Sequence, residues 1–279
     1  MATSILTLRQ ILSSGTAFPI PGAYDRISAR LVGQLGFPLV SVPGSLTGIA
    51  MGVEEPLLTL TEMVNATAEV SKHAGLPVIT DAGSGFGPPE SVPRCVIELE
   101  NAGATAIHIE DEPFPVPLTA HQGPAGLISS DEFRQKITSA VRARQNPEFV
   151  LIARTNAAMG ATPSREEAIR RLTIARDAGA EAGLIVGVRD REGLAYFRKH
   201  LPRFPLMTVG APDLSLEDYT ALGYSLIFYP GMLLHCAVVA MKDVASRLLT
   251  QGGPQDKGSG AEYARLALEL TPLRRSSAG

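Results

Sequence analysis

The chain has 279 residues, of which 45% are hydrophobic and 19% charged, so it is long enough to bury the core of one α/β barrel. Its 28 acidic and 25 basic residues give a formal charge of −3 without a basic run, which argues against nucleic acid or an anionic membrane as a partner. The chain begins without a signal-peptide pattern, and no stretch has the ~18 successive apolar residues that a membrane span requires. We therefore expect a cytoplasmic protein that acts on a small molecule.

Short apolar runs alternate with amphipathic segments along most of the chain. A short helix over residues 5–12 comes first and is expected to cap the fold before the first strand. Eight apolar runs predict strands at Phe18–Ala23, Pro38–Val42, Val78–Asp81, Ala106–Glu110, Phe149–Arg154, Ala182–Val186, Pro205–Val209 and Ser225–Tyr229. Helices that end close to a glycine are predicted at Asp25–Leu35, Thr61–His73, Pro89–Ala102 and Ser164–Ala178.

This alternation predicts a single (β/α)8 TIM-type barrel. Continuous apolar strands separated by helices are typical of a parallel sheet that helices cover, and eight strands is the number that closes such a barrel. The last barrel helix is expected at Met232–Leu249. We therefore assign residues 1–250 to the barrel with its N-terminal cap and residues 251–279 to a partly helical C-terminal tail.

Polar residues stand where several predicted strands end. Asp81 ends the third run, Glu110 the fourth and Arg154 the fifth. Because the carboxyl ends of all strands of a barrel face one mouth, we expect these three side chains to meet there. Carboxylates bind Mg2+, and a guanidinium binds a carboxylate through two hydrogen bonds. The pattern predicts a site for a hard cation and an anionic substrate, the alternative being helix caps or ion pairs without chemistry.

A glycine-rich loop follows the third predicted strand. Its glycines Gly83, Gly85 and Gly87 have the spacing G-x-G-x-G, and Pro88 and Pro89 come directly after them. The dinucleotide fingerprint needs a different spacing and a later acidic residue. We therefore do not expect this loop to bind a nucleotide.

Five stretches of the chain stand in a characteristic order: PGAYDRISARL, LLTLTEM, LPVITDAGSGFG, ELENAGATAIHIED and NPEFVLIARTNA. Over roughly residues 18–245 they resemble the isocitrate lyase/phosphoenolpyruvate mutase superfamily, in the branch of 2-methylisocitrate lyase and oxaloacetate decarboxylase. The resemblance implies a (β/α)8 barrel, commonly a homotetramer whose eighth helix is exchanged between subunits. It also implies Mg2+, with Mn2+ as an alternative, and 2-oxo acids or their enolates as ligands.

Matched residue by residue, the resemblance implies roles for the residues at the strand ends. Asp81 matches the family's metal-ligand aspartate, Glu110 the glutamate that supports the water shell of the metal, and Arg154 a catalytic arginine that grips the substrate carboxylate. Glu54 or Glu55 stands near a further acid of the metal shell, and the motif does not choose between them. The 2-oxo acid end of the substrate is expected to meet the catalytic phenol of Tyr24. Its further binding groups are expected from Gly44, Ser45 and Asn156.

The chain departs from the family pattern at positions that bear on the reaction. Where the family reads DADTGYG, this chain has DAGSGFG, so Gly83 replaces an acid and Phe86 a tyrosine. Where isocitrate and methylisocitrate lyases carry a Lys-Cys-Gly-His loop, this chain has PVPLTAHQG, which argues against both activities and leaves His121 as the catalytic proton donor. Val186 stands where many lyases have glutamate, and in this departure the chain resembles the oxaloacetate decarboxylase branch.

These features predict a carbon–carbon lyase or decarboxylase that acts on a 2-oxo or 2-hydroxy (di)carboxylic acid through a Mg2+-stabilised enolate. The loop over residues 113–126 is expected to close over the substrate. Three alternatives stay open. They are a carbon–phosphorus hydrolase or mutase of the same superfamily, a barrel enzyme that acts on a larger, less polar substrate with little or no metal, and a catalytically silent barrel that binds a carboxylate.

Overall fold

The computed structural model describes residues 6–116, 126–159 and 163–251, together with residues 262, 264–266 and 270. The chain divides into two compact units, Met1–Gly231 and Met232–Gly279. The first unit holds all eight strands, and the second holds the long helix α10, Met232–Gln251. The expected division at residue 250 stays a prediction, and most of the helical tail expected after it lies outside the described residues.

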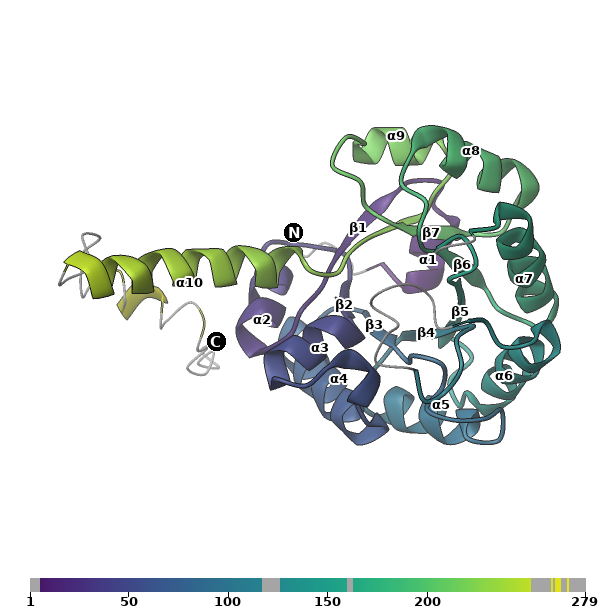
Figure 1. The fold of residues 1–279 in the computed structure, drawn as a ribbon, viewed down its shortest axis with the longest axis horizontal. Helices are drawn as coiled ribbons and strands as arrows, with labels where there is room; N and C mark the ends of the chain where they lie inside the picture. The colour runs from purple at the N-terminus through teal and green to yellow at the C-terminus, as the bar shows by residue number, and fades with distance from the viewer. Residues whose placement is uncertain are drawn as a thin grey trace, which may run out of the picture. The chain divides into compact units, whose positions relative to one another are not determined.

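The eight strands of the first unit form one parallel sheet that is almost closed into a barrel (Figure 1). From β2 to β8 each strand pairs with the next one in sequence, and β1 pairs with β8. Between β1 and β2 there is one bridge, which joins Gly22 and Ser41. The predicted barrel is confirmed, with strands β1 Phe18–Pro21, β2 Val40–Val42, β3 Val78–Asp81, β4 Ala106–Glu110, β5 Val150–Thr155, β6 Ala182–Ile185, β7 Leu206–Val209 and β8 Leu226–Tyr229.

Helices connect the strands and surround the sheet in Figure 1. Their starts follow from local capping: Asp25 accepts the backbone N–H of Ser28, and Thr59 accepts that of Glu62, so each satisfies a donor that the first helical turn leaves free. The predicted helices are confirmed to within three residues. The helices of this unit are α1 Leu8–Ser13, α2 Arg26–Gln34, α3 Gly44–Met51, η1 Glu55–Leu57, α4 Leu60–Ala74, α5 Val92–Asn101, α6 Ser130–Ala143, α7 Arg165–Asp177, α8 Arg191–His200 and α9 Leu216–Ala221.

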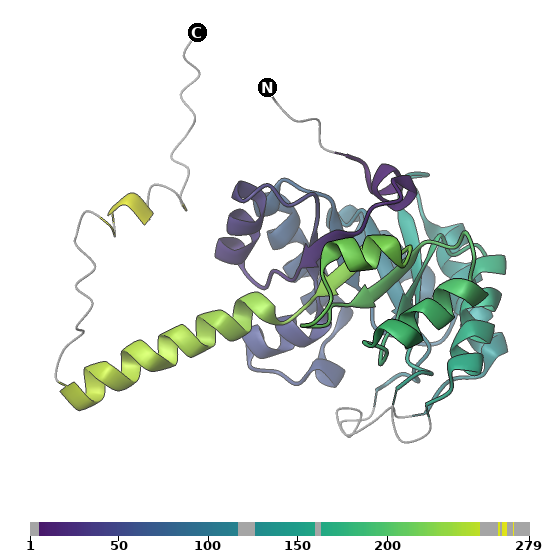
Figure 2. The ribbon, with the colours of Figure 1, turned by 90° about the horizontal axis from the view of Figure 1, so that it is seen from above.

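Helix α1 closes the amino-terminal end of the barrel, as Figure 2 shows from the side. Its Leu8 and Ile11 belong to the same buried cluster as the apolar residues that fill the barrel. Arg9 holds the helix in place through Glu181, at 2.7 Å, and the carbonyl oxygen of Pro147, at 2.6 Å, and these two partners precede strands β6 and β5. The predicted cap helix therefore leaves the carboxyl ends of the strands as the open end.

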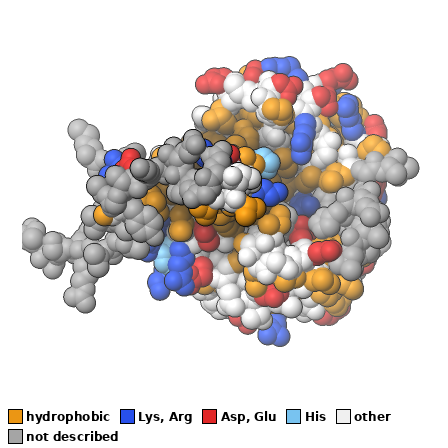
Figure 3. Space-filling view, turned by 60° about the vertical axis from the view of Figure 1, so that its left-hand side comes forward, with side chains coloured by type: hydrophobic (Ala, Val, Ile, Leu, Met, Phe, Trp, Pro, Cys, Tyr) orange, Lys and Arg blue, Asp and Glu red, His pale blue; other side chains and the backbone are white. Residues whose placement is uncertain are grey.

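The surface of the molecule carries acidic and basic side chains mixed together over the face seen in Figure 3. Such mixing fits the small formal charge of −3 and the expectation of a small-molecule ligand. Among the helices of the described residues, none is long and apolar enough to cross a membrane.

Candidate active site

A cavity of about 450 Å3 opens at the carboxyl ends of β2 to β5. Its volume lies within the range of small-molecule sites. The described residues that line it belong to the ends of β3, β4 and β5 or to the segments that follow β2 to β5. They are Gly44, Glu55, Pro56, Leu58, Met63, Asp81, Gly83, Ser84, Phe86, Glu110, Glu112, Phe114, Val116, Arg154, Asn156 and Met159.

Asp81 ends β3 at the floor of this cavity. Its carboxylate accepts the backbone N–H of Gly83 at 2.9 Å and that of Gly44 at 3.3 Å. The Arg154 guanidinium lies 3.5 Å away, as does Nδ1 of His108. Burial opposes ionisation of Asp81, but nearby positive charge and the two backbone donors lower its pKa. Because burial lowers the pKa of His108 to about 4, Arg154 supplies that positive charge at neutral pH. Asp81 is therefore an ionised, buried carboxylate at neutral pH.

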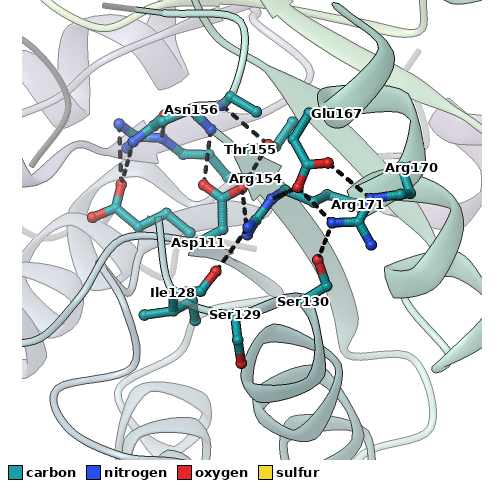
Figure 4. Close-up of polar contacts among 12 residues, drawn as sticks. Asp111, Ile128, Ser129, Ser130, Arg154, Thr155, Asn156, Glu167, Arg170 and Arg171 are labelled. Carbon is teal, nitrogen blue, oxygen red and sulfur yellow. Dashed lines mark hydrogen bonds and ion pairs between the residues drawn. The ribbon is translucent and has the colours of Figure 1, made fainter. Parts of the chain in front are cut away.

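Arg154 lies one residue before the end of β5 and joins the acids that end β3 and β4. Its Nη2 lies 3.1 Å from Glu110 and its Nη1 3.5 Å from Asp81. Its Nε donates to Oδ1 of Asn156 at 3.2 Å (Figure 4). Burial works against the charge, yet the surrounding carboxylates raise the pKa of Arg154. The structure thus brings Asp81, Glu110 and Arg154 together. They form ion pairs and also line an open cavity.

The cavity contains more acids than its guanidinium can balance. Glu55 and Glu112 line it together with Asp81 and Glu110. Burial raises the pKa of Glu110 to about 8 and that of Glu55 to about 7; the neighbouring carboxylates add to this effect, and Arg154 opposes it. Burial also raises the pKa of Glu112. Three of the four carboxyl groups therefore resist ionisation as long as no further positive charge enters.

These acids fit a magnesium ion that is held mainly through water. Among the described residues, no three or more His, Cys, Asp or Glu side chains are grouped closely enough to hold a metal ion on their own. Mg2+ usually binds one or two carboxylates and keeps several water molecules. Asp81 can serve as the direct ligand, and the glutamates that share its cavity can hold the waters. The oxygen donors and the surplus of negative charge both suit a hard divalent cation.

Two acids of the cavity were missed or left open by the sequence analysis. The structure places Glu55 in the lining, where the Ser45 backbone N–H donates to it. Glu112 follows β4 and lies in the same lining as Glu110. Because successive residues of an extended chain point to opposite sides, residues two apart share a side, and this alternation is the signal that could have identified Glu112.

The other predicted site residues are divided between different surroundings. Gly44 and Asn156 line the cavity. Ser45 stands in the first turn of α3, and its backbone N–H is already bound to Glu55, as that of Gly44 is to Asp81. Tyr24 lies in a separate groove formed by α2, α3 and α4, and the structure does not bring it to the cavity. The groove residues are Tyr24, Asp25, Arg26, Ile27, Thr47, Ala50, Met51, Glu62, Asn65, Ala66, Glu69 and Val70. His121 lies outside the described residues.

Apolar side chains form another part of the cavity lining, its apolar wall. Phe86 and Phe114 meet edge to face with ring centroids 6.4 Å apart, and each belongs to the loop after a different strand. Phe86 has φ 54°, a left-handed backbone conformation that is uncommon for a bulky residue. The wall is made of Pro56, Leu58, Met63, Phe86, Phe114, Val116 and Met159. The cavity therefore offers a charged floor and an apolar side.

Comparisons with known proteins agree with this fold. The family model described as phosphoenolpyruvate phosphomutase matches residues 8–249. A 2,3-dimethylmalate lyase of Eubacterium barkeri is 34% identical over 247 residues, which cover 86% of this chain and 84% of that protein. An oxaloacetate decarboxylase of Pseudomonas putida (strain GB-1) is 34% identical over 268 residues, covering 94% and 90%. The solved structure of a phosphonopyruvate hydrolase in complex with oxalate and Mg2+ has a TM-score of 0.83 and 29% identity, covering 96% of this chain and 98% of that one.

Proposed function

The chain belongs to the phosphoenolpyruvate phosphomutase family, and from this premise we propose that it is a Mg2+-dependent carbon–carbon lyase or decarboxylase acting on a 2-oxo or 2-hydroxy (di)carboxylic acid. The observation that carries the proposal is the meeting of Asp81, Glu110 and Arg154 in one cavity. Relatives named as a 2,3-dimethylmalate lyase and an oxaloacetate decarboxylase support the choice of a carbon–carbon bond. The predicted superfamily is confirmed by the family match.

The charged floor supplies what such a reaction requires from the protein. Arg154 would bind the substrate carboxylate through its guanidinium, which is partly exposed to the cavity. Asn156 would donate its side-chain amide to the same ligand. Asp81 would hold Mg2+, and Glu55, Glu110 and Glu112 its waters. When bound, Mg2+ would polarise the oxygens of the 2-oxo or 2-hydroxy acid and stabilise the negative charge that develops as the adjacent bond breaks. We propose Mn2+ as a substitute because it favours the same oxygen ligands.

The apolar wall supports a narrower substrate class. A short diacid would leave the apolar lining residues Phe86, Phe114 and Met159 uncovered on the side of the cavity, whereas an alkyl or larger apolar substituent would cover them. Gly83 adds room, because a Cβ built on it would meet no atom within 4 Å. We therefore propose a substrate with a carboxylate at one end and an apolar substituent near the carbon whose bond breaks. The larger, less polar substrate considered above remains the second candidate on the same observation.

Assembly, location and the proton donor are part of the proposal. We propose a cytoplasmic homotetramer that exchanges its last barrel helix. In its support, α10 has six large apolar side chains that are exposed to solvent: Met232, Val239, Met241, Val244, Leu248 and Leu249. The proton donor stays a prediction at His121. Tyr24, the predicted phenol, would need to move from its groove to reach the cavity.

A substrate panel tests the proposed activity on the full chain. Oxaloacetate, malates with 2- or 3-alkyl substituents and phosphonopyruvate would each be incubated with Mg2+ or with a chelator, and products followed by proton and phosphorus NMR. Mg2+-dependent cleavage of a carbon–carbon bond, faster for the alkylated acids, is the expected result. Release of phosphate from phosphonopyruvate alone would move the assignment to the carbon–phosphorus branch. Oxalate binding without any turnover would indicate the silent carboxylate-binding barrel.

A further inference from the structure

A second buried ion pair lies outside the lining of the cavity, between Asp111 and Arg171 (Figure 4). Asp111 is the residue after β4 and is 0% exposed, and Arg171 lies on α7 and is 5% exposed. Arg171 Nη1 is 3.4 Å from Asp111 Oδ2. A buried ion pair adds little net stability compared with apolar residues of similar size, because both charges lose their water. Its contacts therefore need another explanation.

Asp111 holds the end of β5. Its Oδ1 accepts the backbone N–H of Asn156 at 2.9 Å, and its Oδ2 accepts the hydroxyl of Thr155 at 2.6 Å. Asn156 in turn accepts the Nε–H of Arg154 at 3.2 Å and donates Nδ2 to Glu110 at 3.4 Å. Asp111 thus holds the backbone that carries Arg154 and Asn156, two residues of the cavity lining. Figure 4 shows Asp111 beside Thr155 and Asn156.

Arg171 holds the point at which the β4–α6 connection returns to the barrel. Its Nη2 donates to the carbonyl oxygen of Ile128 at 2.7 Å, while the N–H of Ile128 donates to the carbonyl oxygen of Asp111 at 3.0 Å. Both backbone groups of Ile128 are therefore bound by the same ion pair and its backbone. The connection leaves the barrel at Asp111, and its first residues include Glu112 and Phe114 of the cavity lining.

We propose that Asp111 and Arg171 are positioning residues for the cavity. They hold the Asn156 backbone and the two ends of the β4–α6 connection, at Asp111 and Ile128, in fixed positions relative to one another. Among the described contacts, the charged groups of the pair reach the cavity lining through the backbone N–H of Asn156. Its effect on the ligand is therefore expected in the binding of the carboxylate by Arg154 and Asn156. The ligand part of this inference rests on the proposed function.

The chain contains a matched control on the same helix. Arg170 precedes Arg171, has a side chain that is 54% exposed, and binds Glu167 and the hydroxyl of Ser130 (Figure 4). Arg171 also binds Glu167, at 2.6 Å. The variants Arg170→Met and Arg171→Met therefore each remove one positive charge and the contact to the same glutamate, but only the second removes the bonds to Asp111 and Ile128.

Calorimetry separates positioning from a general loss of structure. With saturating Mg2+, Arg171→Met is expected to weaken oxalate binding by ~10–100-fold, the range seen for groups that orient a ligand-binding residue. Mg2+ alone should bind within about 3-fold of its original affinity, because Asp81 keeps its own contacts. Arg171→Lys should keep part of the oxalate affinity that Arg171→Met loses, and the control Arg170→Met should bind oxalate as tightly as the unchanged protein. Equal oxalate affinity for Arg171→Met and the unchanged protein, or equal losses for both methionine variants, would overturn the proposal.

Hydrogen exchange gives a readout that does not depend on a ligand. The amides of Asn156 and Ile128 are expected to exchange faster in Arg171→Met and in Arg171→Lys, while amides of β7 keep their rates. If the unchanged protein binds no oxalate with Mg2+, the proposed function fails, and exchange alone decides the role of the pair. Unchanged exchange at both amides would then overturn the positioning role, and faster exchange at both would support it.

Discussion

The two halves of the barrel mouth differ sharply in chemistry. Over β2 to β5, strand ends and the segments after them supply every described residue that lines the cavity, including its four acids and Arg154. Over β6 and β7, the strands lead into Val186 or end in Val209, and these side chains pack against the buried core of the barrel. Four consecutive strand ends therefore carry the site, and the opposite half serves as scaffold for the described part of the cavity. Function in this fold depends on which strand ends are polar, while eight strands are needed to close it.

The largest effect is expected at the charged half, from Asp81→Asn. The amide keeps the shape of the side chain but removes the charge that would bind the metal directly, so Mg2+ affinity should fall by at least ~100-fold. Mg2+ titration calorimetry measures this, with a thermal melt to verify that the barrel is still folded. Metal binding that survives the substitution would remove Asp81 from the ligand set.

A smaller and opposite effect is expected from Gly83→Asp, which restores the acid of the family pattern. Gly83 has φ +50° and open space at its Cβ position, and aspartate tolerates this left-handed conformation better than most residues. The added carboxylate should tighten Mg2+ binding about 10-fold if it reaches the metal. Gly83→Asn has the same shape without the charge and should leave the affinity almost unchanged. Equal affinities for the two variants would show that the new carboxylate lies too far from the ion.

The acids of the charged half also predict a dependence on pH. The pKa of Glu110 is raised from 4.5 to about 8 and that of Glu55 from 4.5 to about 7. Between 4.5 and these raised values, the folded, metal-free protein keeps protons that the unfolded chain has lost. Its stability should fall as the pH rises through this window. Mg2+ favours the ionised acids, so it should raise the melting temperature more at pH 8.5 than at pH 6. A shift of equal size at both pH values would contradict the surplus of negative charge.

The smallest effect on binding is expected on the β6 and β7 side of the mouth, from Val209→Ala. Val209 is partly buried against the core, so its truncation should cost roughly 1 kcal/mol of unfolding free energy. Affinities for Mg2+ and for oxalate should stay within about 2-fold, since the residue lies outside the cavity lining. A tenfold weaker oxalate complex would show that the β7 side of the mouth takes part in the site.

Sequence reasoning located the strands and the charged half because both follow local rules. The apolar runs at Val78–Asp81 and Ala106–Glu110 match β3 and β4 to the residue, since buried parallel strands are continuous in apolar residues. A polar residue near the end of such a strand is a candidate for the open mouth, which all the strand ends face. The convergence of Asp81, Glu110 and Arg154 therefore required only the order of the strands.

The remaining features depend on contacts that leave no local pattern. Tyr24 was expected in the site, but its backbone N–H binds the Ser28 hydroxyl in the start of α2, and its side chain lines the groove between α2, α3 and α4. Arg171 meets Asp111 across 60 residues of chain, and a helical arginine gives no sign in sequence that it is buried. Such pairs become visible only when the barrel brings α7 against the β4–α6 connection.

The measurement that tests the central claim most directly is calorimetry of the unmodified protein with oxalate, a small planar dicarboxylate that resembles the enolate of a 2-oxo acid, in the presence and absence of Mg2+. If the four acids and Arg154 form one metal and carboxylate site, oxalate should bind in the presence of Mg2+, and its affinity should fall by at least ~10-fold when a chelator removes the metal. Oxalate binding that is absent, or equally strong without Mg2+, would contradict a magnesium-dependent site in this half of the barrel.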